Sequence, residues 1–425
     1  MSNKPTTREV VEAGLGKRRR TETRFRLLGI LATAVGVLFL GVFFATLIAE
    51  GAGAFKQTFV QLEFTLDAEV IAPGGELDLQ YADFDGLVRT ALRSRFPGVE
   101  SRADRRELNR IVSVGAGYQL RSLVASNPEL IGTTQTLWVP ASSEVDMLAK
   151  GNIDASIDEA LRTMSDKQIG WVQSFVDADE VRSRFNSALF GNGDSRDPEL
   201  AGIKGAVMGS FYMLLVTIAL SFPIGVAAAI YLEEFAPKNR WSDLIEVNIN
   251  NLAAVPSIVF GLLGLAVFIN WMSLPRSAPL VGGLVLTLLT LPVIIIASRA
   301  AIQAVPPSIR EAALGLGASR TQVVFHHVLP LAMPGMLTGA IIGMSRALGE
   351  SAPLLMIGMV AFIVDVPGGF TDPATALPVQ IYLWADSPER AFAERTSAAI
   401  IVLLGFLLLM NLAAVIMRKR MERKW

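Results

Sequence analysis

Hydrophobic residues are concentrated in long uninterrupted runs near both ends of this chain. The first run covers residues 27–48 and contains 22 residues without a charge. An α-helix rises 1.5 Å per residue, so this run predicts a helix that can cross about 30 Å of hydrocarbon. It is longer than the apolar region of a signal peptide, and we therefore expect a retained transmembrane helix.

Further apolar runs follow residue 200. They cover residues 205–232, 252–273, 279–297, 332–349 and 397–417. A shorter run at 354–364 follows Pro353 and cannot cross a bilayer as a helix, so we expect it to be re-entrant or of half depth. The pattern predicts an α-helical polytopic membrane protein with six transmembrane helices.

Residues 49–200 have a different pattern, with no apolar run long enough to span. Apolar and polar residues alternate strictly from Val60 to Val70, which predicts a half-buried strand. Apolar residues from Phe84 to Phe96 follow helical spacing, and helical patterns recur near 156–164 and 178–190. About 150 residues suffice for a small domain, and we predict an inserted α+β domain here.

Composition and charge narrow the class of protein. Of the 425 residues, 52% are hydrophobic, which is typical of a membrane protein. The net charge of −1 gives no basic excess that would favour nucleic-acid binding. The sequence has no cysteine, so disulfides, thiolate metal ligands and cysteine nucleophiles are excluded.

The positions of the positive charges predict the orientation of the chain in the membrane. Eighteen Lys and Arg residues fall on one side: eight in residues 1–26, then Lys238, Arg240, Arg299, Arg310, Arg320, Arg418, Lys419, Arg420, Arg423 and Lys424. The short loops on the other side carry three, Arg276, Arg390 and Arg395. Because cytoplasmic loops are enriched in Lys and Arg, we expect both termini in the cytoplasm. Residues 1–26 are then a cytoplasmic basic tail, 49–200 form an extracytoplasmic (periplasmic) domain, and the protein lies in the cell (inner) membrane.

Residues 308–330 form a polar island between two apolar runs, on the predicted cytoplasmic side. Ser308 with Glu311 and Ser319 with Gln322 are two helix-start signals in quick succession. We expect two short helices with a bend at Gly315 and Gly317, the second ending before Pro330. On geometry alone, an ordinary surface helix-turn-helix loop fits equally well.

This loop resembles the EAA loop of ABC importer permeases. The residues that match are Glu311, Ala312, Ala313, Gly317, Leu329 and Pro330. The resemblance implies that the loop forms a coupling helix, which docks in a cleft of a cytoplasmic ATPase. Small alanine side chains permit close approach of that partner, and Glu311 offers an ionic contact.

The resemblance extends to the phosphate-transport permeases of the PstA type. It rests on the stretches LAAVPSIVFGLLGL at 252–265, MSRALGESAPLL at 344–355 and ALPVQIYLWADSPE at 376–389. It implies that 201–425 are a type I ABC importer permease domain, and that 49–200 are an insertion absent from the short form of the family. The partners implied are a second homologous permease (PstC type), two ATPase subunits (PstB type), a periplasmic phosphate-binding protein (PstS type), inorganic phosphate and the lipid bilayer.

Arg346 is a candidate for the substrate pathway. It lies 12 residues after Pro334, which places it roughly 18 Å into the predicted span. A charge at that depth is costly in lipid, so Arg346 should face protein or water. Its planar guanidinium matches a phosphate oxyanion. Glu350, four residues later, lies on the same helix face, and the two side chains could instead only neutralise each other.

The sequence contains no GxxxxGK[ST] phosphate-binding loop. We therefore expect a permease rather than an enzyme, with no cofactor in this chain and with ATP and Mg bound by the partner ATPase. An importer of another oxyanion, such as sulfate or molybdate, remains an alternative. A membrane sensor with an external ligand-binding domain and a secondary transporter are further alternatives. A sensor would be expected to carry a cytoplasmic output domain, and only eight residues follow Met417 in this sequence. A secondary transporter would not need a coupling loop.

Overall fold

The computed structural model describes residues 7–72, 79 and 81–421. The chain divides into two compact units, residues 1–50 and 51–425. The first unit is helix α1 (Thr7–Gly51), which carries the predicted apolar run 27–48. The helix also includes most of the predicted basic tail, whose residues 1–6 lie outside the described part of the chain.

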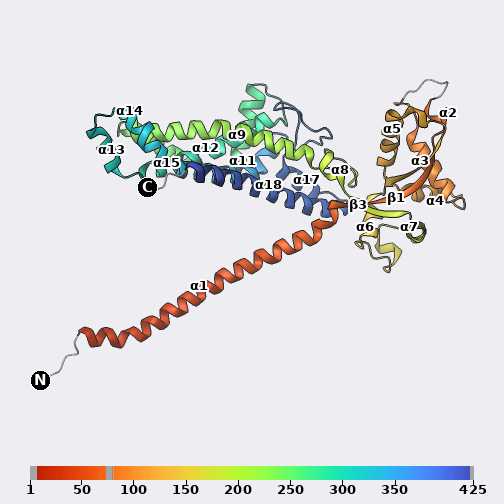
Figure 1. The fold of residues 1–425 in the computed structure, drawn as a ribbon, viewed down its shortest axis with the longest axis horizontal. Coiled ribbons are helices and arrows are strands. Elements are labelled where there is room, and N and C mark those ends of the chain that lie inside the picture. Colours follow the sequence, from red (N-terminus) through yellow and green to blue (C-terminus); the bar gives the residue numbers. More distant parts are fainter. Residues whose placement is uncertain (1–6, 73–78, 80, 422–425) are drawn as a thin grey trace. The chain divides into compact units, whose positions relative to one another are not determined.

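The second unit begins with a small antiparallel sheet of strand order β2-β1-β3, whose strands β1 and β3 are labelled in Figure 1. Its strands are β1 (Lys56–Thr65), β2 (Thr134–Pro140) and β3 (Val181–Phe185). The even-numbered residues Val60, Leu62 and Phe64 are buried, as the alternating pattern predicts. Because alternate side chains of a strand point to opposite faces, these residues place one face of β1 in the core.

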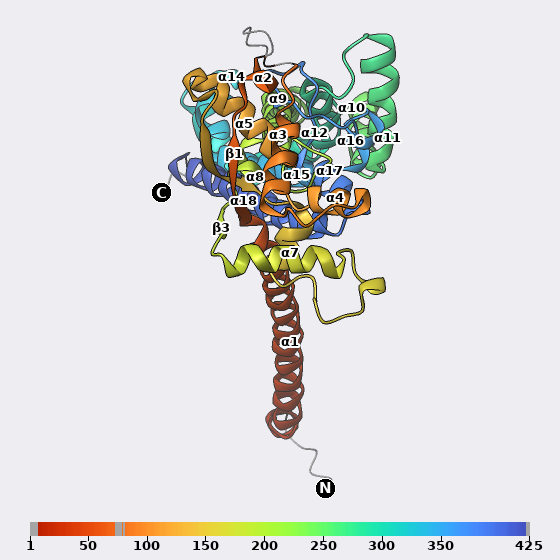
Figure 2. The same ribbon diagram turned by 90° about the vertical axis from the view of Figure 1, so that its right-hand side faces the viewer.

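Seven short helices complete the sheet domain and its connection to the apolar helices. They are α2 (Ala68–Ile71), α3 (Phe84–Arg95), α4 (Arg102–Asn109), α5 (Gly115–Ser126), α6 (Ser143–Ala149), α7 (Asp166–Asp177) and α8 (Ser187–Gly191). Helix α3 packs on β1 and α5 on β2, and Figure 2 shows both helices beside the sheet. The predicted helix from Phe84 is confirmed, and its apolar stripe joins Phe64 and Phe175 in one core.

Two helix predictions in this region are wrong. Residues 156–164 contain only a single helical turn, η4 (Glu159–Leu161), and residues 178–190 contain strand β3 followed by the short α8. Val181, Phe185 and Leu189 recur every four residues and imitate a helix face. Pairing of Val181 with Val60 and of Phe185 with Lys56 overrides that local pattern.

The apolar helices follow residue 200. They are α9 (Lys204–Ile230), α10 (Arg240–Ala253), α11 (Ser257–Gly264), α12 (Pro279–Gln303), α15 (Leu329–Gly349), α17 (Leu377–Ala385) and α18 (Ala391–Met421). With α1, the described residues form five helices long and apolar enough to span, or six if the bent pair α10 and α11 counts as one. The predicted run 252–273 is therefore not one straight helix. The two helices meet at 101°, and Pro256 lies at the bend as the N-cap of α11, because proline cannot continue a helical hydrogen-bond ladder.

The short run 354–364 contains only the five-residue helix α16 (Ala352–Met356) and turns after it. Gly358 has φ +93°, a backbone conformation that glycine adopts without strain. Its carbonyl oxygen accepts a hydrogen bond of 2.6 Å from the Ser277 hydroxyl. The segment is thus held as a folded loop beside α11.

Helix α12 is the centre of the apolar part, and it packs against both α9 and α15. A side chain at Gly283 would place its Cβ 2.5 Å from the Cβ of Val216 on α9. A side chain at Gly339 of α15 would collide with Ala297 of α12. Glycine at these positions lets the helix backbones approach closely, and such contacts drive helix association in lipid.

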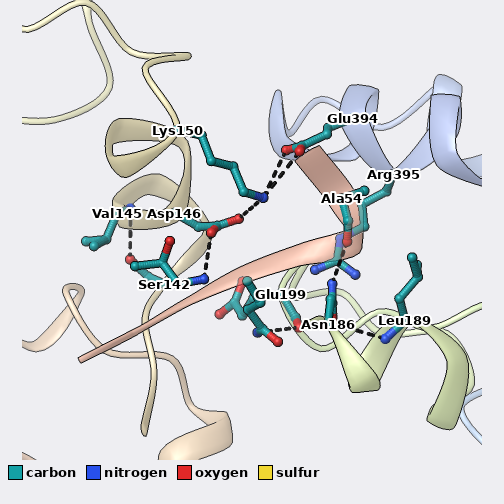
Figure 3. A network of polar contacts seen from close by, with 12 residues as sticks. Ala54, Ser142, Val145, Asp146, Lys150, Asn186, Leu189, Glu199, Glu394 and Arg395 are labelled. Carbon is teal, nitrogen blue, oxygen red and sulfur yellow. Dashed lines mark hydrogen bonds and ion pairs between the residues drawn. The ribbon is translucent and has the colours of Figure 1, made fainter. Parts of the chain in front are cut away.

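A buried ion cluster links the sheet domain to the last apolar helix (Figure 3). The Lys150 ammonium lies 2.6 Å from Asp146 Oδ2 and 3.2 Å from Glu394 Oε1. Asp146 also accepts a hydrogen bond of 2.8 Å from the backbone N–H of Thr58 on β1. Asp146 belongs to α6, Lys150 is the C-cap of that helix and Glu394 belongs to α18, so the cluster fixes these two helices to each other.

Amide and guanidinium groups complete this junction (Figure 3). The Asn186 side chain donates to the carbonyl of Ala54, and the Gln57 side chain donates to the carbonyl of Glu199. The buried Arg395 of α18 donates to the carbonyl of Ala201 at 3.0 Å. These bonds satisfy backbone carbonyl groups that would be costly to bury without a partner. They also hold the segment that connects the sheet domain to α9 in one conformation.

A cleft of about 700 Å³ lies beside the junction. Its lining includes the carboxyl groups of Glu144, Glu199 and Glu389. Burial raises the pKa of the Glu199 carboxyl above its ordinary value, against a hydrogen bond from Ser113 that lowers it. Burial also raises the pKa of Glu144 and that of Glu389. The three carboxylates therefore destabilise the folded junction when all are ionised.

Replacing Lys150 with methionine removes the cation between two buried carboxylates. We expect Lys150→Met to lower the free energy of unfolding by about 3 kcal/mol or more, measured by thermal unfolding of the purified full chain. The double variant Lys150→Met/Glu394→Gln should recover part of the loss, because one of the two unpaired charges is gone. An unchanged melting temperature in Lys150→Met would contradict the role of the cluster.

Glu199→Gln should stabilise the fold in a pH-dependent way. The pKa of Glu199 is raised in the folded state. Its carboxyl group therefore contributes favourably to the free energy of unfolding at low pH, and this contribution is lost as the pH rises through that pKa. We expect the variant to melt a few degrees higher than the parent at pH 7 to 8, with the difference vanishing as the pH falls toward the ordinary value of 4.5. Glu129→Gln, which removes a carboxylate at an exposed position, serves as the control. A pH-independent difference for Glu199→Gln would reject the argument.

Candidate functional site

The loop between α12 and α15 has the predicted helix-bend-helix form. It comprises α13 (Pro307–Gly315), α14 (Arg320–Gln322) and a π-helical turn, η7 (Val323–Val328). Gly317 has φ +87° at the bend, which an L side chain rarely adopts. Ser319 and Gln322 form a reciprocal capping box at the start of α14. The bend and the second cap are therefore confirmed.

Two details of the predicted loop are wrong. Ser308 does not cap the first helix, because α13 begins one residue earlier, with Pro306 at the cap position and Pro307 in the first turn. Pro330 does not end the second helix either, since a continuous helix runs from Arg320 to Gly349. Pro330 lies in the first turn of α15, directly after the π-helical turn η7. A π-helical turn changes which carbonyl each backbone N–H meets, so the helix can continue although proline has no N–H to donate.

Ion pairs attach this loop to the helices beneath it. Arg310 of α13 donates to Glu234 at 2.9 Å and to the carbonyls of Val305 and Ile302 at 2.6 and 2.9 Å. Glu234 belongs to the turn η5 (Tyr231–Phe235) at the end of α9. Arg310 thereby couples the start of the loop to the ends of both α9 and α12.

A second arginine strengthens the same attachment. Arg299 of α12 lies 2.5 Å from Glu233 of η5 and 3.0 Å from Glu246 of α10. Sequence reasoning used both arginines only as charges that predict orientation. Their partners lie 53 to 76 residues away along the chain, so spacing within the loop contains no signal for them.

The predicted coupling residues divide into an exposed and a packed group. Glu311 and Ala312 are exposed on α13, and Gly317 is exposed at the bend. Ala313 is buried in a cluster with Val323 and Val328, and Leu329 and Pro330 are half-buried. The structure thus separates residues that hold the loop in shape from residues that are free to contact a partner.

Sequence reasoning missed two exposed leucines. Leu316 is 90% exposed and Leu314 is 49% exposed, both beside Glu311 and Ala312 on the outer surface of the loop. Exposed apolar side chains that cluster at a bend are typical of a surface that another protein covers. The sequence contained a signal for this exposed surface: Leu314 and Leu316 are two positions apart, so they cannot both lie on the buried face of one helix.

Arg346 lies in the last turn of α15, and Glu350 is the residue that caps this helix. The Arg346 Nε atom is 3.6 Å from Glu350 Oε1, a pairing too long for a good hydrogen bond. The Arg346 side chain is 45% exposed and that of Glu350 is 20% exposed. Arg346 shares the uncovered face of α15 with Ile342 and Gly349.

The two groups of predicted site residues lie at opposite ends of one helix. Leu329 begins α15 and Arg346 is in its last turn, a separation of about 26 Å at 1.5 Å per residue. The structure therefore does not bring Glu311 and Arg346 together.

Comparison with protein families matches two separate parts of the chain. Residues 221–424 match the family described as "Binding-protein-dependent transport system inner membrane component". Residues 12–159 match a family described as a domain of unknown function, DUF3333. The inserted sheet domain thus falls largely within a family of its own.

Curated relatives match the permease part. A probable ABC transporter permease protein, YqgI of Bacillus subtilis, is 39% identical over 155 residues, which cover 36% of this chain and 52% of that protein. The phosphate transport system permease protein PstA 1 of Mycobacterium tuberculosis is 32% identical over 217 residues, covering 51% of this chain and 70% of that protein. PstA of Haemophilus influenzae is 29% identical and covers 53% and 78%. The match spans only about half the length of the Bacillus relative.

Solved structures include one described as inward-facing conformations of the MetNI methionine ABC transporter. One of its chains is 20% identical, with a TM-score of 0.42, and the match covers 52% of this chain and 97% of that chain. Together, the family match and the long apolar helices identify a multi-pass membrane protein. The chain belongs to the family of binding-protein-dependent transport system inner membrane components and, within it, to the permeases of the PstA type.

Proposed function

We propose that this chain is a permease subunit of an ATP-driven phosphate importer and forms part of its transmembrane pathway. The observation that carries the proposal is the 32% identity over 217 residues to a phosphate transport permease. The partners are a second homologous permease of the PstC type, two ATPase subunits of the PstB type that bind ATP and Mg²⁺, and an external phosphate-binding protein of the PstS type.

The proposed orientation places both termini and the α13–α14 loop in the cytoplasm. It is supported by the excess of Lys and Arg on that side, eighteen against three. The sheet domain then lies outside the cell membrane, joined to the permease through the Lys150 cluster.

The α13–α14 loop is the proposed contact with the ATPase. Glu311, Ala312 and the exposed leucines Leu314 and Leu316 form the surface that the ATPase would cover. When ATP closes the ATPase pair, the loop moves with it, and the Arg310–Glu234 and Arg299–Glu233 pairs transmit the movement to α9 and α12. The permease then opens outward to accept phosphate, and hydrolysis reverses the movement.

Arg346 is the proposed contact with phosphate. Its guanidinium is accessible and makes only a long contact with Glu350, so it can exchange this partner for an oxyanion without leaving the helix. The uncovered face of α15 on which it lies is suited to border a pathway shared with the second permease.

Coupling can be tested at Gly317. A β-branched residue cannot adopt φ +87° without strain, so Gly317→Val should distort the bend and separate ATP hydrolysis from transport. We expect phosphate uptake into proteoliposomes to fall about tenfold or more per ATP hydrolysed, with normal membrane insertion; Glu311→Ala should act in the same direction.

Gly315→Ala is the matched control for this loop. Gly315 has no positive φ, and a Cβ there meets nothing within 4 Å, so alanine should leave coupling unchanged. Normal uptake per ATP in both Gly317→Val and Glu311→Ala would reject docking through this loop.

The substrate can be tested by uptake through the reconstituted complex. We expect labelled phosphate to be imported in preference to sulfate and molybdate, and Arg346→Gln to reduce phosphate uptake roughly ten- to a hundredfold by loss of a charge-assisted hydrogen bond. Glu350→Gln distinguishes the two roles of the pair. Transport should survive in Glu350→Gln if Arg346 meets phosphate. If instead Glu350→Gln is equally impaired and the double variant recovers, the pair is only structural.

A further inference from the structure

Four arginines of the sheet domain line one hollow beside the last turn of α3. The hollow has a volume of about 420 Å³, and its lining consists of Arg93, Glu100, Arg102, Arg105, Arg106 and Asn109. Arg93 belongs to α3, and the other three arginines belong to α4, which packs beside α3 (Figure 2). Four guanidinium groups therefore share this site with a single carboxyl group. We refer to the site as the arginine hollow.

Helix α4 separates its positive charges from its negative charges. Successive residues of an α-helix are rotated by about 100°, so its three arginines share one face and its two acidic residues lie on the opposite face. The acidic face is turned toward α7. Asp104 lies 2.7 Å from the ammonium of Lys167, and Glu107 accepts a hydrogen bond of 2.7 Å from the Ser165 hydroxyl. The acidic groups of α4 are thus occupied on the side away from the arginine hollow.

Other arginines of α3 have carboxylate partners. Arg89 lies 3.0 Å from Asp83, and Arg95 lies 3.1 Å from Glu180. Among residues 7–72, 79 and 81–421, by contrast, none of the four arginines of the hollow forms an ion pair, although Glu100 is part of the lining. All four are exposed. Because like charges repel, this arrangement favours entry of an anion.

The backbone holds one guanidinium of the hollow in place. The Nε atom of Arg105 donates a hydrogen bond of 3.1 Å to the carbonyl of Val99. A backbone carbonyl has no net charge, so this bond orients the guanidinium without neutralising it. A guanidinium has five N–H donors, and the terminal ones of Arg105 are left for a ligand.

We propose that the arginine hollow binds a tetrahedral oxyanion with two negative charges, phosphate or sulfate. Guanidinium groups from two helices line the hollow, so its ligand has to accept hydrogen bonds from several directions. The four oxygens of a tetrahedral oxyanion point in different directions. The two oxygens of a carboxylate lie in one plane and match a single guanidinium. The geometry therefore favours a tetrahedral dianion over a carboxylate.

This site is independent of the transport proposal. It uses only residues of the sheet domain, whereas the proposed contact with phosphate in the permease is Arg346. The two can therefore fail separately: uptake by the complex tests Arg346, and binding to the isolated chain tests the arginine hollow. The inserted domain then has an anionic ligand of its own. Because the guanidinium groups are exposed, salt screens them and binding weakens as the ionic strength rises.

The experiment measures equilibrium binding of labelled phosphate and of labelled sulfate to the full chain in nanodiscs of zwitterionic lipid. Arg346→Gln is the parent for these measurements, so that the proposed contact in the permease does not add to the signal. We expect saturable binding of at least one of the two anions. Arg102→Gln and Arg106→Gln should each weaken that binding about tenfold or more, through loss of a charge-assisted hydrogen bond.

Arg121→Gln is the matched control. Arg121 is exposed on α5 and does not line the hollow, so the variant makes the same change in net charge at a distant place. Its affinity should stay close to that of the parent. The proposal is overturned if neither anion binds, or if Arg102→Gln and Arg106→Gln both bind as Arg121→Gln does. Equal displacement of the bound anion by acetate at constant ionic strength would also overturn it.

Discussion

The close approach of α9 and α15 to α12 is the packing constraint on which the apolar part of this permease depends. In lipid, burial of apolar surface gives helices little reason to associate, so contact between backbones has to supply the attraction. Gly283 and Gly339 permit that contact, because any side chain at either position would meet a neighbouring helix. Helix α12 is therefore the helix on which both α9 and α15 pack. The α13–α14 loop follows the end of α12, so α12 connects this loop to both neighbouring helices.

The α13–α14 loop is attached to this support by charges rather than by apolar packing alone. Arg310 and Arg299 each join an acidic residue of η5 to the end of α12, and each is largely buried. Removing one partner of such a pair leaves an uncompensated charge, so the loop and the ends of α9 and α12 are constrained to move together. Ala313, Val323 and Val328 fill the space beneath, whereas Glu311, Leu314 and Leu316 remain on the outside. The loop therefore has a rigid interior and an exposed surface that a partner protein can contact.

The inserted sheet domain is held to the permease by a small number of polar contacts. Lys150 joins α6 to α18, and Arg395 and Asn186 satisfy carbonyl groups close to the start of α9 and of β1. Three carboxyl groups with raised pKa values lie in the neighbouring cleft, so the junction is sensitive to pH in a way that the glycine-packed helices are not.

The amino-acid sequence alone was enough to predict the apolar runs, the alternating strand that became β1, the helix from Phe84, the capping box at Ser319 and the bend at Gly317. These features depend on residues close together in the chain, and local periodicity and backbone preference are sufficient to predict them. Contacts between distant parts of the chain were needed to show that Val181–Phe185 is a strand, that the helix continues through Pro330, and that Arg310 meets Glu234. The folded structure was also needed to show that Leu316 is exposed. The physical reason is that a pattern shows which face of an element is apolar, whereas the residue that covers this face comes from a distant part of the chain.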